Sequence, residues 1–183
     1  MKIVLKVFIT VIAFTTVMNA QTSSTSTVLG AYQKNMKYFT SGSGAWESVN
    51  QDNDPKKEDG FKEFRIEFKA LEGGFGMNVK VLGVRNDNKK VVFWNIYSYY
   101  DAETKTIKHL QLGTGGDSGA GTETIMDDKS VSIHMNMCSF EGTKWEFKDE
   151  GVVVNENEWQ STTLMKNKEG EWKVTQKSTW KKI

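Results

Sequence analysis

The sequence predicts an all-β protein, a single up-and-down antiparallel barrel of about eight to ten strands with a short N-terminal helix. Three observations lead to this expectation. Apolar and polar residues alternate with a period of two over most of the chain after residue 45, as in half-buried strands. Short turn-forming segments separate these stretches, and no long crossover interrupts them, which favours a closed meander. Gly44-Ala45-Trp46 stands at the start of the first stretch, where a flexible glycine and a large ring suit the end of an enclosed core.

The first twenty residues have the order of a secretory signal peptide. Lys2 and Lys6 supply positive charge, Val7–Phe14 is almost wholly apolar, and Ala20 is a small residue at the expected cleavage position. This pattern predicts export to the periplasm or secretion. The expected organisation is a signal peptide over residues 1–20, a polar tether over 21–27 and one barrel domain over 28–183.

Charge, hydropathy and cysteine content argue against nucleic-acid binding, a membrane span in the mature chain and an internal disulfide. The whole chain carries a formal charge of +1, and loss of Lys2 and Lys6 with the signal peptide would leave it slightly negative. Such a protein has no basic field to hold nucleic acid. The apolar N-terminal run is too short to span a bilayer comfortably, so no integral membrane span is expected in the mature chain. The single Cys138 makes no internal disulfide, and the core alone must stabilise the fold.

The early elements follow from spacing. Val28–Phe39 places apolar residues three and four positions apart, which predicts a short helix across one end of the barrel. Trp46 then opens the first strand, and the charged segment Asp52–Gly60, with the only proline, predicts a solvated loop. Clean alternation predicts the next strand from Phe64, Ile66, Phe68 and Ala70, and the one after it from Phe75, Met77, Val79 and Val81.

Later elements are predicted in the same way. Val91–Tyr100 is apolar on both faces, so we expect the N-terminal helix or a partner to cover its outer side. A glycine-rich segment, Gly113–Gly121, predicts a turn, and Val152–Leu164 predicts one strand that carries Trp159. Further strands are expected at Ile107–Leu112, Thr122–Met126, Val131–Cys138, around Trp145 and Phe147, and from Trp172 to the end of the chain.

The chain resembles the calycin superfamily of lipocalins and fatty-acid-binding proteins, and more closely small exported bacterial lipocalin-like proteins. The resemblance rests on Gly44-Ala45-Trp46 and on Tyr100-Asp101-Ala102-Glu103-Thr104, a Tyr-Asp-x-x-Thr hairpin in mid-chain. It implies a lipocalin-like barrel. In lipocalins an arginine near the last strand stacks on the tryptophan ring. Here Lys181 and Lys182 are the available cations, and a lysine still makes a cation–π contact.

No catalytic residue, metal site or cofactor is predicted. Gly116-Asp117-Ser118-Gly119 copies the segment around the nucleophile of trypsin-like proteases. The next residue is Ala120 where that family has glycine, no upstream Ala-His-Cys segment occurs, and the chain is too short for the paired barrels of that family. His109 and His134 lie mid-chain without the paired spacing of a zinc site, and neither is near the C-terminal strands, where haem-binding barrels have their ligand. Alternation identifies no inward acid or base, so a binding protein is favoured over an enzyme.

We therefore expect a barrel that binds a small apolar or amphipathic ligand. Gln176 and Ser178 are polar residues on an otherwise apolar face, so they predict orienting groups in a pocket, or a pair bonded to each other or to a buried water. The alternatives are an envelope interaction module with a filled barrel, contacting its partner through Val91–Tyr100, or an isomerase, cyclase or hydrolase on the same barrel. The expected ligand-binding residues are Trp46, Phe64, Phe68, Tyr97, Met135, Met137, Gln176, Ser178 and Trp180.

Overall fold

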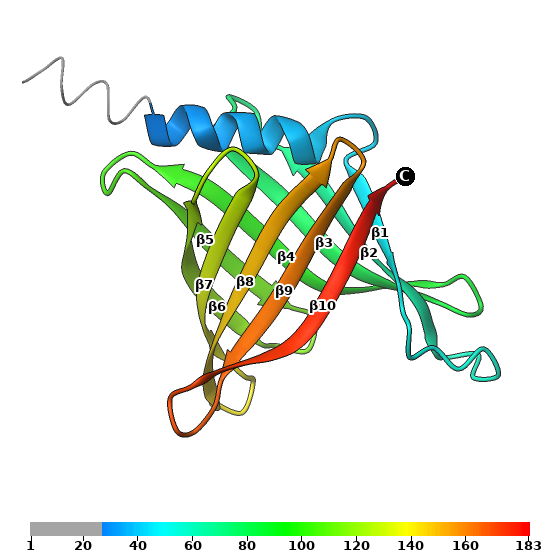
Figure 1. The fold of residues 1–183 in the computed structure, drawn as a ribbon. Coiled ribbons are helices and arrows are strands. Elements are labelled where there is room, and N and C mark those ends of the chain that lie inside the picture. Colours follow the sequence, from blue (N-terminus) through cyan, green and yellow to red (C-terminus); the bar gives the residue numbers. More distant parts are fainter. Residues whose placement is uncertain (1–26) are drawn as a thin grey trace, which may run out of the picture.

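Ten antiparallel strands form a closed barrel in the computed structural model, which describes residues 27–183 (Figure 1). Each strand pairs with its neighbours in sequence, and β1 pairs with β10 to close the ring. The predicted all-β up-and-down barrel is confirmed. The expected signal peptide and nearly all of the tether lie outside the described residues. The strands are β1 (Ala45–Val49), β2 (Phe61–Ala70), β3 (Gly76–Arg85), β4 (Lys90–Asp101), β5 (Thr106–Gly113), β6 (Ser118–Ile125), β7 (Ser130–Cys138), β8 (Lys144–Asn155), β9 (Glu158–Lys166) and β10 (Trp172–Lys182).

A helix over residues 27–40 lies across one end of the barrel, as the spacing predicts (Figure 1). Tyr32, Met36 and Phe39 occupy one helical face and are buried, because residues four and three apart point the same way. They pack with side chains from the strand ends in the main core cluster. This segment, called the lid helix below, closes the barrel end. Between residues 27 and 183, no helix has the length and apolar character needed to cross a membrane.

The Gly-x-Trp segment anchors the chain just after the lid helix. Gly44 has a φ of 67°, and a Cβ there would overlap the carbonyl oxygen of Phe68. That close approach lets the Phe68 amide donate a hydrogen bond of 2.8 Å to the Gly44 carbonyl. Trp46 is fully buried, and its Nε1 donates to the Phe39 carbonyl at 3.0 Å. The Nζ of Lys182 lies 4.7 Å from the Trp46 ring centroid, which confirms the expected cation–π contact.

The Tyr-Asp-x-x-Thr segment forms the β4–β5 hairpin. Asp101 Oδ1 accepts hydrogen bonds from the backbone amides of Glu103 and Thr104, and its Oδ2 accepts one from the Thr104 hydroxyl at 2.7 Å. These bonds favour the ionised carboxylate and lower the pKa of Asp101. Asp and Thr at this spacing therefore supply the hydrogen bonds that the turn needs from within the turn itself.

Three expectations about the strands differ from the structure. Only the first part of Gly113–Gly121 is a turn, because β6 begins at Ser118 and runs through the last glycines. Val152–Leu164 is a hairpin, with β8 ending at Asn155 and β9 beginning at Glu158. The lid helix lies across the barrel end and does not cover the outer face of β4 (Tyr97 and Tyr99). Tyr97 and Tyr99 on that face are 38% and 45% exposed.

Candidate functional site

The barrel interior contains a cavity of about 430 Å³ below the lid helix, partly open to solvent. Every strand except β1 contributes to its wall, and the lid helix contributes Asn35 and Phe39. Most of the wall is apolar, with rings from Phe64 and Phe68 on β2 and Phe93 on β4. A concave apolar space of this size suits one small molecule.

A buried His–Glu pair lies in this wall. His109 on β5 and Glu123 on β6 sit diagonally across neighbouring strands, since Gly121 is the residue directly opposite His109. His109 Nε2 lies 2.7 Å from Glu123 Oε2, and the two side chains are 7% and 4% exposed. His109 Nδ1 has no hydrogen-bond partner among residues 27–183 and is not sealed from solvent, so it borders the cavity. The pair thus presents one free imidazole nitrogen to any occupant.

Asp149 on β8 adds a second carboxyl group to the same wall. The hydroxyl of Thr163, its partner on β9, donates a hydrogen bond of 2.8 Å to Oδ1. Burial raises the pKa of Asp149, and the Thr163 hydrogen bond and the proximity of His109 only partly offset this effect. Oδ2 has no partner within the described chain and is not sealed off, so it too borders the cavity.

The lid helix contributes a polar contact above this group. The Tyr32 hydroxyl lies 2.8 Å from Ser98 Oγ of β4, and both residues are fully buried. Burial raises the pKa of Tyr32, and the nearby carboxylate of Glu123 raises it further, so the phenol stays neutral. Tyr32 therefore ties the lid helix to the barrel beside the His109–Glu123 pair.

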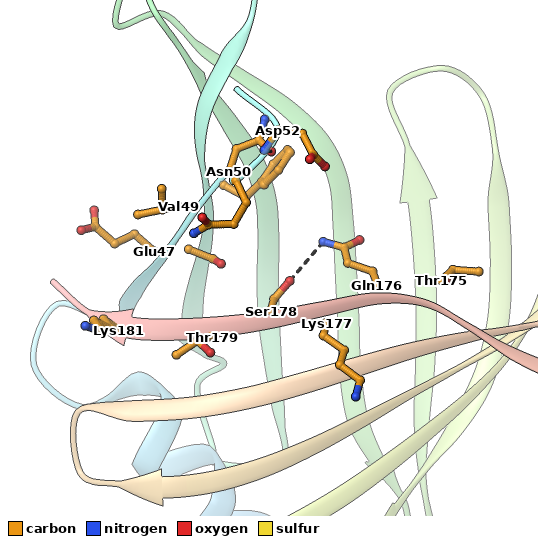
Figure 2. A pocket seen from close by; sticks show the side chains of 13 residues that line it. Glu47, Val49, Asn50, Asp52, Thr175, Gln176, Lys177, Ser178, Thr179 and Lys181 are labelled. Carbon is orange, nitrogen blue, oxygen red and sulfur yellow. Dashed lines mark hydrogen bonds between the residues drawn. The ribbon is translucent and has the colours of Figure 1, made fainter. Parts of the chain in front are cut away.

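A second hollow, of about 690 Å³, opens on the barrel wall between β1 and β10. The two strands meet near Glu47 and Lys181 and then diverge (Figure 2). We call the diverging part the seam, formed by residues 48–52 and 175–179. Phe64, Gln176 and Ser178 line both the seam and the interior cavity. The two hollows therefore adjoin at this wall.

The structure brings most of the expected ligand-binding residues to the cavity. Trp46 and Met135 are buried but lie outside the cavity lining. Tyr97 points to the outer face, because Ile96 and Ser98 on either side of it point inward. Gln176 Nε2 donates a hydrogen bond of 3.1 Å to Ser178 Oγ, so the two side chains pair with each other, which was one of the two alternatives for them (Figure 2). The residues that do line the cavity are Phe64, Phe68, Met137, Gln176, Ser178 and Trp180.

Sequence reasoning missed His109, Glu123 and Asp149. In β5 the usual pattern is inverted, since Leu110 and Leu112 are exposed while His109 and Gln111 are buried. The signal was Ile107, which shares the inner face with His109 and Gln111 by period two. No group of three or more His, Cys, Asp or Glu side chains in residues 27–183 is placed to hold a metal ion.

Comparison with known proteins adds no assignment. No family model matches the chain, and no curated protein matches its sequence. The functional reading therefore depends on the geometry of the cavity and the chemistry of its wall.

Proposed function

We propose that this protein is an exported lipocalin-like barrel that binds one small apolar or amphipathic molecule in its interior. The observation that carries the proposal is the cavity of about 430 Å³, whose apolar wall includes a few convergent polar groups. The closed meander and the Lys182 contact on Trp46 support the resemblance to calycins. An unfilled interior also favours ligand carriage over an interaction module with a filled barrel.

Native mass spectrometry of the protein purified from its own host tests the proposal. We expect extra mass that disappears after extraction with organic solvent. Binding of N-phenyl-1-naphthylamine, a neutral fluorescent apolar probe, gives a second measurement on the extracted protein. A bare mass together with no fluorescence enhancement would contradict the proposal.

A matched pair of variants locates the bound probe. Ile96 and Tyr97 are neighbours on β4, one lining the cavity and the other exposed outside. Ile96→Trp places an indole ring in the cavity and should weaken probe binding, at a stability cost of about 1–3 kcal/mol. Tyr97→Trp should bind the probe like the unaltered protein. Equal binding by both variants would place the probe outside the barrel.

Export rests on residues 1–20 and has its own test. The proposal expects a mature protein that begins at Gln21 and is recovered from the periplasm or the culture medium. Mass measurement of the protein from each fraction checks the cleavage site. Recovery of the uncleaved chain from the cytoplasm alone would contradict it.

One observation favours a second candidate, an acid–base enzyme such as an isomerase. His109 Nδ1 and Asp149 Oδ2 both border the cavity without partners in the described residues. His109 would take a proton from the substrate while protonated Asp149 gives one to a carbonyl oxygen, so the step conserves protons. Incubation with a host metabolite extract tests this candidate. A metabolite consumed by the unaltered protein but not by His109→Gln supports it, and an extract left unchanged by both removes it.

A further inference from the structure

Among the ionisable groups that line the cavity, carboxyl groups outnumber basic ones. Two carboxyl groups, Glu123 and Asp149, and the imidazole of His109 border it, but no lysine or arginine of residues 27–183 does. The whole chain has 24 lysines and arginines against 23 acidic residues. The overall composition therefore does not explain why acidic residues line the cavity while lysine and arginine do not. The described cations lie elsewhere, and the cavity wall is acidic.

An acidic wall discriminates among head groups. A ligand carboxylate would be buried near Glu123 and Asp149 with no lysine or arginine to pair with it, and an unpaired buried charge is costly. The one basic group, His109, already contacts Glu123 at 2.7 Å. Ligands with an anionic end are therefore disfavoured in this cavity.

A cationic or hydrogen-bond-donating head group has an available acceptor in this cavity. Asp149 Oδ2 borders the cavity without a partner in the described chain, while Oδ1 is held by the Thr163 hydroxyl. The Thr163 bond fixes the carboxyl group, so the free oxygen is preorganised as an acceptor. Phe64, Phe93 and Trp145 supply apolar surface in the same cavity.

We propose that the cavity takes an amphipathic amine, with its ammonium group at Asp149 and its apolar body against the aromatic wall. The inference rests on the proposed ligand-binding function and specifies the class of ligand. Glu123 lies on the same wall and adds to the attraction for a positive charge. The Asp149 carboxylate is the acceptor that sets the preference.

The proposal fixes the sign of the pH dependence. Because burial raises the pKa of Asp149, its free carboxyl group keeps a proton to a higher pH than an ordinary aspartate, whereas a bound ammonium favours the ionised form. Affinity for the amine therefore rises with pH from the ordinary range of an aspartate upward, and it levels once the free carboxyl group is ionised. The neighbouring titratable groups are His109 and Glu123 in the same cavity wall, Tyr32 near Glu123, and Glu150 beside Asp149.

Three probes with one alkyl chain and different head groups test the inference: decylamine, decanol and decanoate. Each is titrated against bound N-phenyl-1-naphthylamine on the full-length extracted protein. We expect decylamine to compete about tenfold more tightly than decanol, and decanoate to compete least. Asp149→Asn should weaken decylamine by about tenfold and leave decanol within about twofold. Glu156, which is exposed in the turn between β8 and β9, supplies the control, and Glu156→Gln should change neither affinity.

Each result has one reading. Decanoate competing as well as decylamine, or decylamine binding unchanged in Asp149→Asn, would overturn the inference. Failure of all three probes to displace a bound N-phenyl-1-naphthylamine would also overturn it, while leaving the binding function standing. Absence of probe binding and of host-derived extra mass would instead remove the proposed function itself. Retained decanol binding shows that Asp149→Asn keeps its cavity.

Discussion

The junction between β1 and β10 has two parts that differ in backbone pairing and in burial. Near the lid helix, Trp46 and Glu47 pair with Lys182 and Lys181, and the ring of Trp46 is fully buried. Beyond Glu47 the same two strands diverge at the seam, where Val49 is 64% exposed. We call the first part the sealed end. One pair of strands thus closes the barrel at one level and opens it at another.

The difference shows what closes this barrel. At the sealed end, Phe39 and Tyr38 pack their rings within 6.0 and 5.3 Å of the Trp46 ring, and backbone pairing comes with that packing. At the seam the facing side chains are polar or charged except for Val49, and the pairing ends. Buried aromatic area, more than strand propensity, decides where the two strands stay together.

The largest effect is expected from removing the ring at the sealed end. Trp46→Ala should lower the free energy of unfolding by about 3–5 kcal/mol, because it deletes a fully buried side chain and leaves a cavity. Val49→Ala, on the same strand but at the seam, should change it by less than about 0.5 kcal/mol. Urea denaturation followed by circular dichroism measures both. Similar losses for the two variants would break the comparison.

The next effect concerns the glycine that precedes this ring. Gly44→Ala should cost about 2–4 kcal/mol, because it adds a positive-φ strain to an overlap with the Phe68 carbonyl. Gly42 has nearly the same φ, 68°, but open space around it. Gly42→Ala should therefore cost only the strain, about 1–2 kcal/mol. Equal losses in the same denaturation experiment would show that the close approach of Gly44 to Phe68 contributes nothing.

The sequence predicted the sealed end well. Period-two alternation predicted the strands, and three- and four-residue spacing predicted the lid helix. Gly44 and Trp46 predicted the closure. Each of these features depends on residues that are close together in the sequence. Lys182 could be named as a candidate for the same reason, since it lies near the last residue of the final strand.

The candidate site was harder to predict. Tyr97 was expected inside because β4 is apolar on both faces, and alternation alone does not choose between two apolar faces. His109 was missed because the neighbouring Leu110 is the exposed residue, which reverses the usual rule. The seam depends on where two strands from opposite ends of the chain stop pairing, and no local pattern encodes that.

Covalent closure of the seam tests whether it gives access to the cavity. Val49→Cys and Thr179→Cys, in a Cys138→Ser background, place one thiol on each side of the seam for a short cleavable bifunctional reagent. Because Phe64, Gln176 and Ser178 line both hollows, linking should slow both association and dissociation of N-phenyl-1-naphthylamine by about tenfold. The equilibrium affinity should stay the same. Stopped-flow fluorescence measures the rates.

Cleavage of the linker is the control for this experiment. The two cysteines without the reagent, and the protein after cleavage, should exchange the probe like the Cys138→Ser parent. Unchanged rates in the linked protein would mean that the probe reaches the cavity from a barrel end, and the seam would then be a surface groove only.

The smallest effect is expected from the cation at the sealed end. Lys182 Nζ lies over the rings of Trp46 and Tyr38, at 4.7 and 5.3 Å from their centroids, and donates a hydrogen bond of 2.8 Å to Ser41 Oγ. Lys182→Met keeps the alkyl stem and removes the charge, so it should cost about 0.5–1 kcal/mol. Lys181→Met, one residue earlier and exposed at the edge of the seam, should stay within about 0.5 kcal/mol of the parent. A loss that is equal for both lysines in urea denaturation would assign the effect to net charge, whereas a loss confined to Lys182 ties it to the contacts that its ammonium group makes at the sealed end, with the two rings and with Ser41.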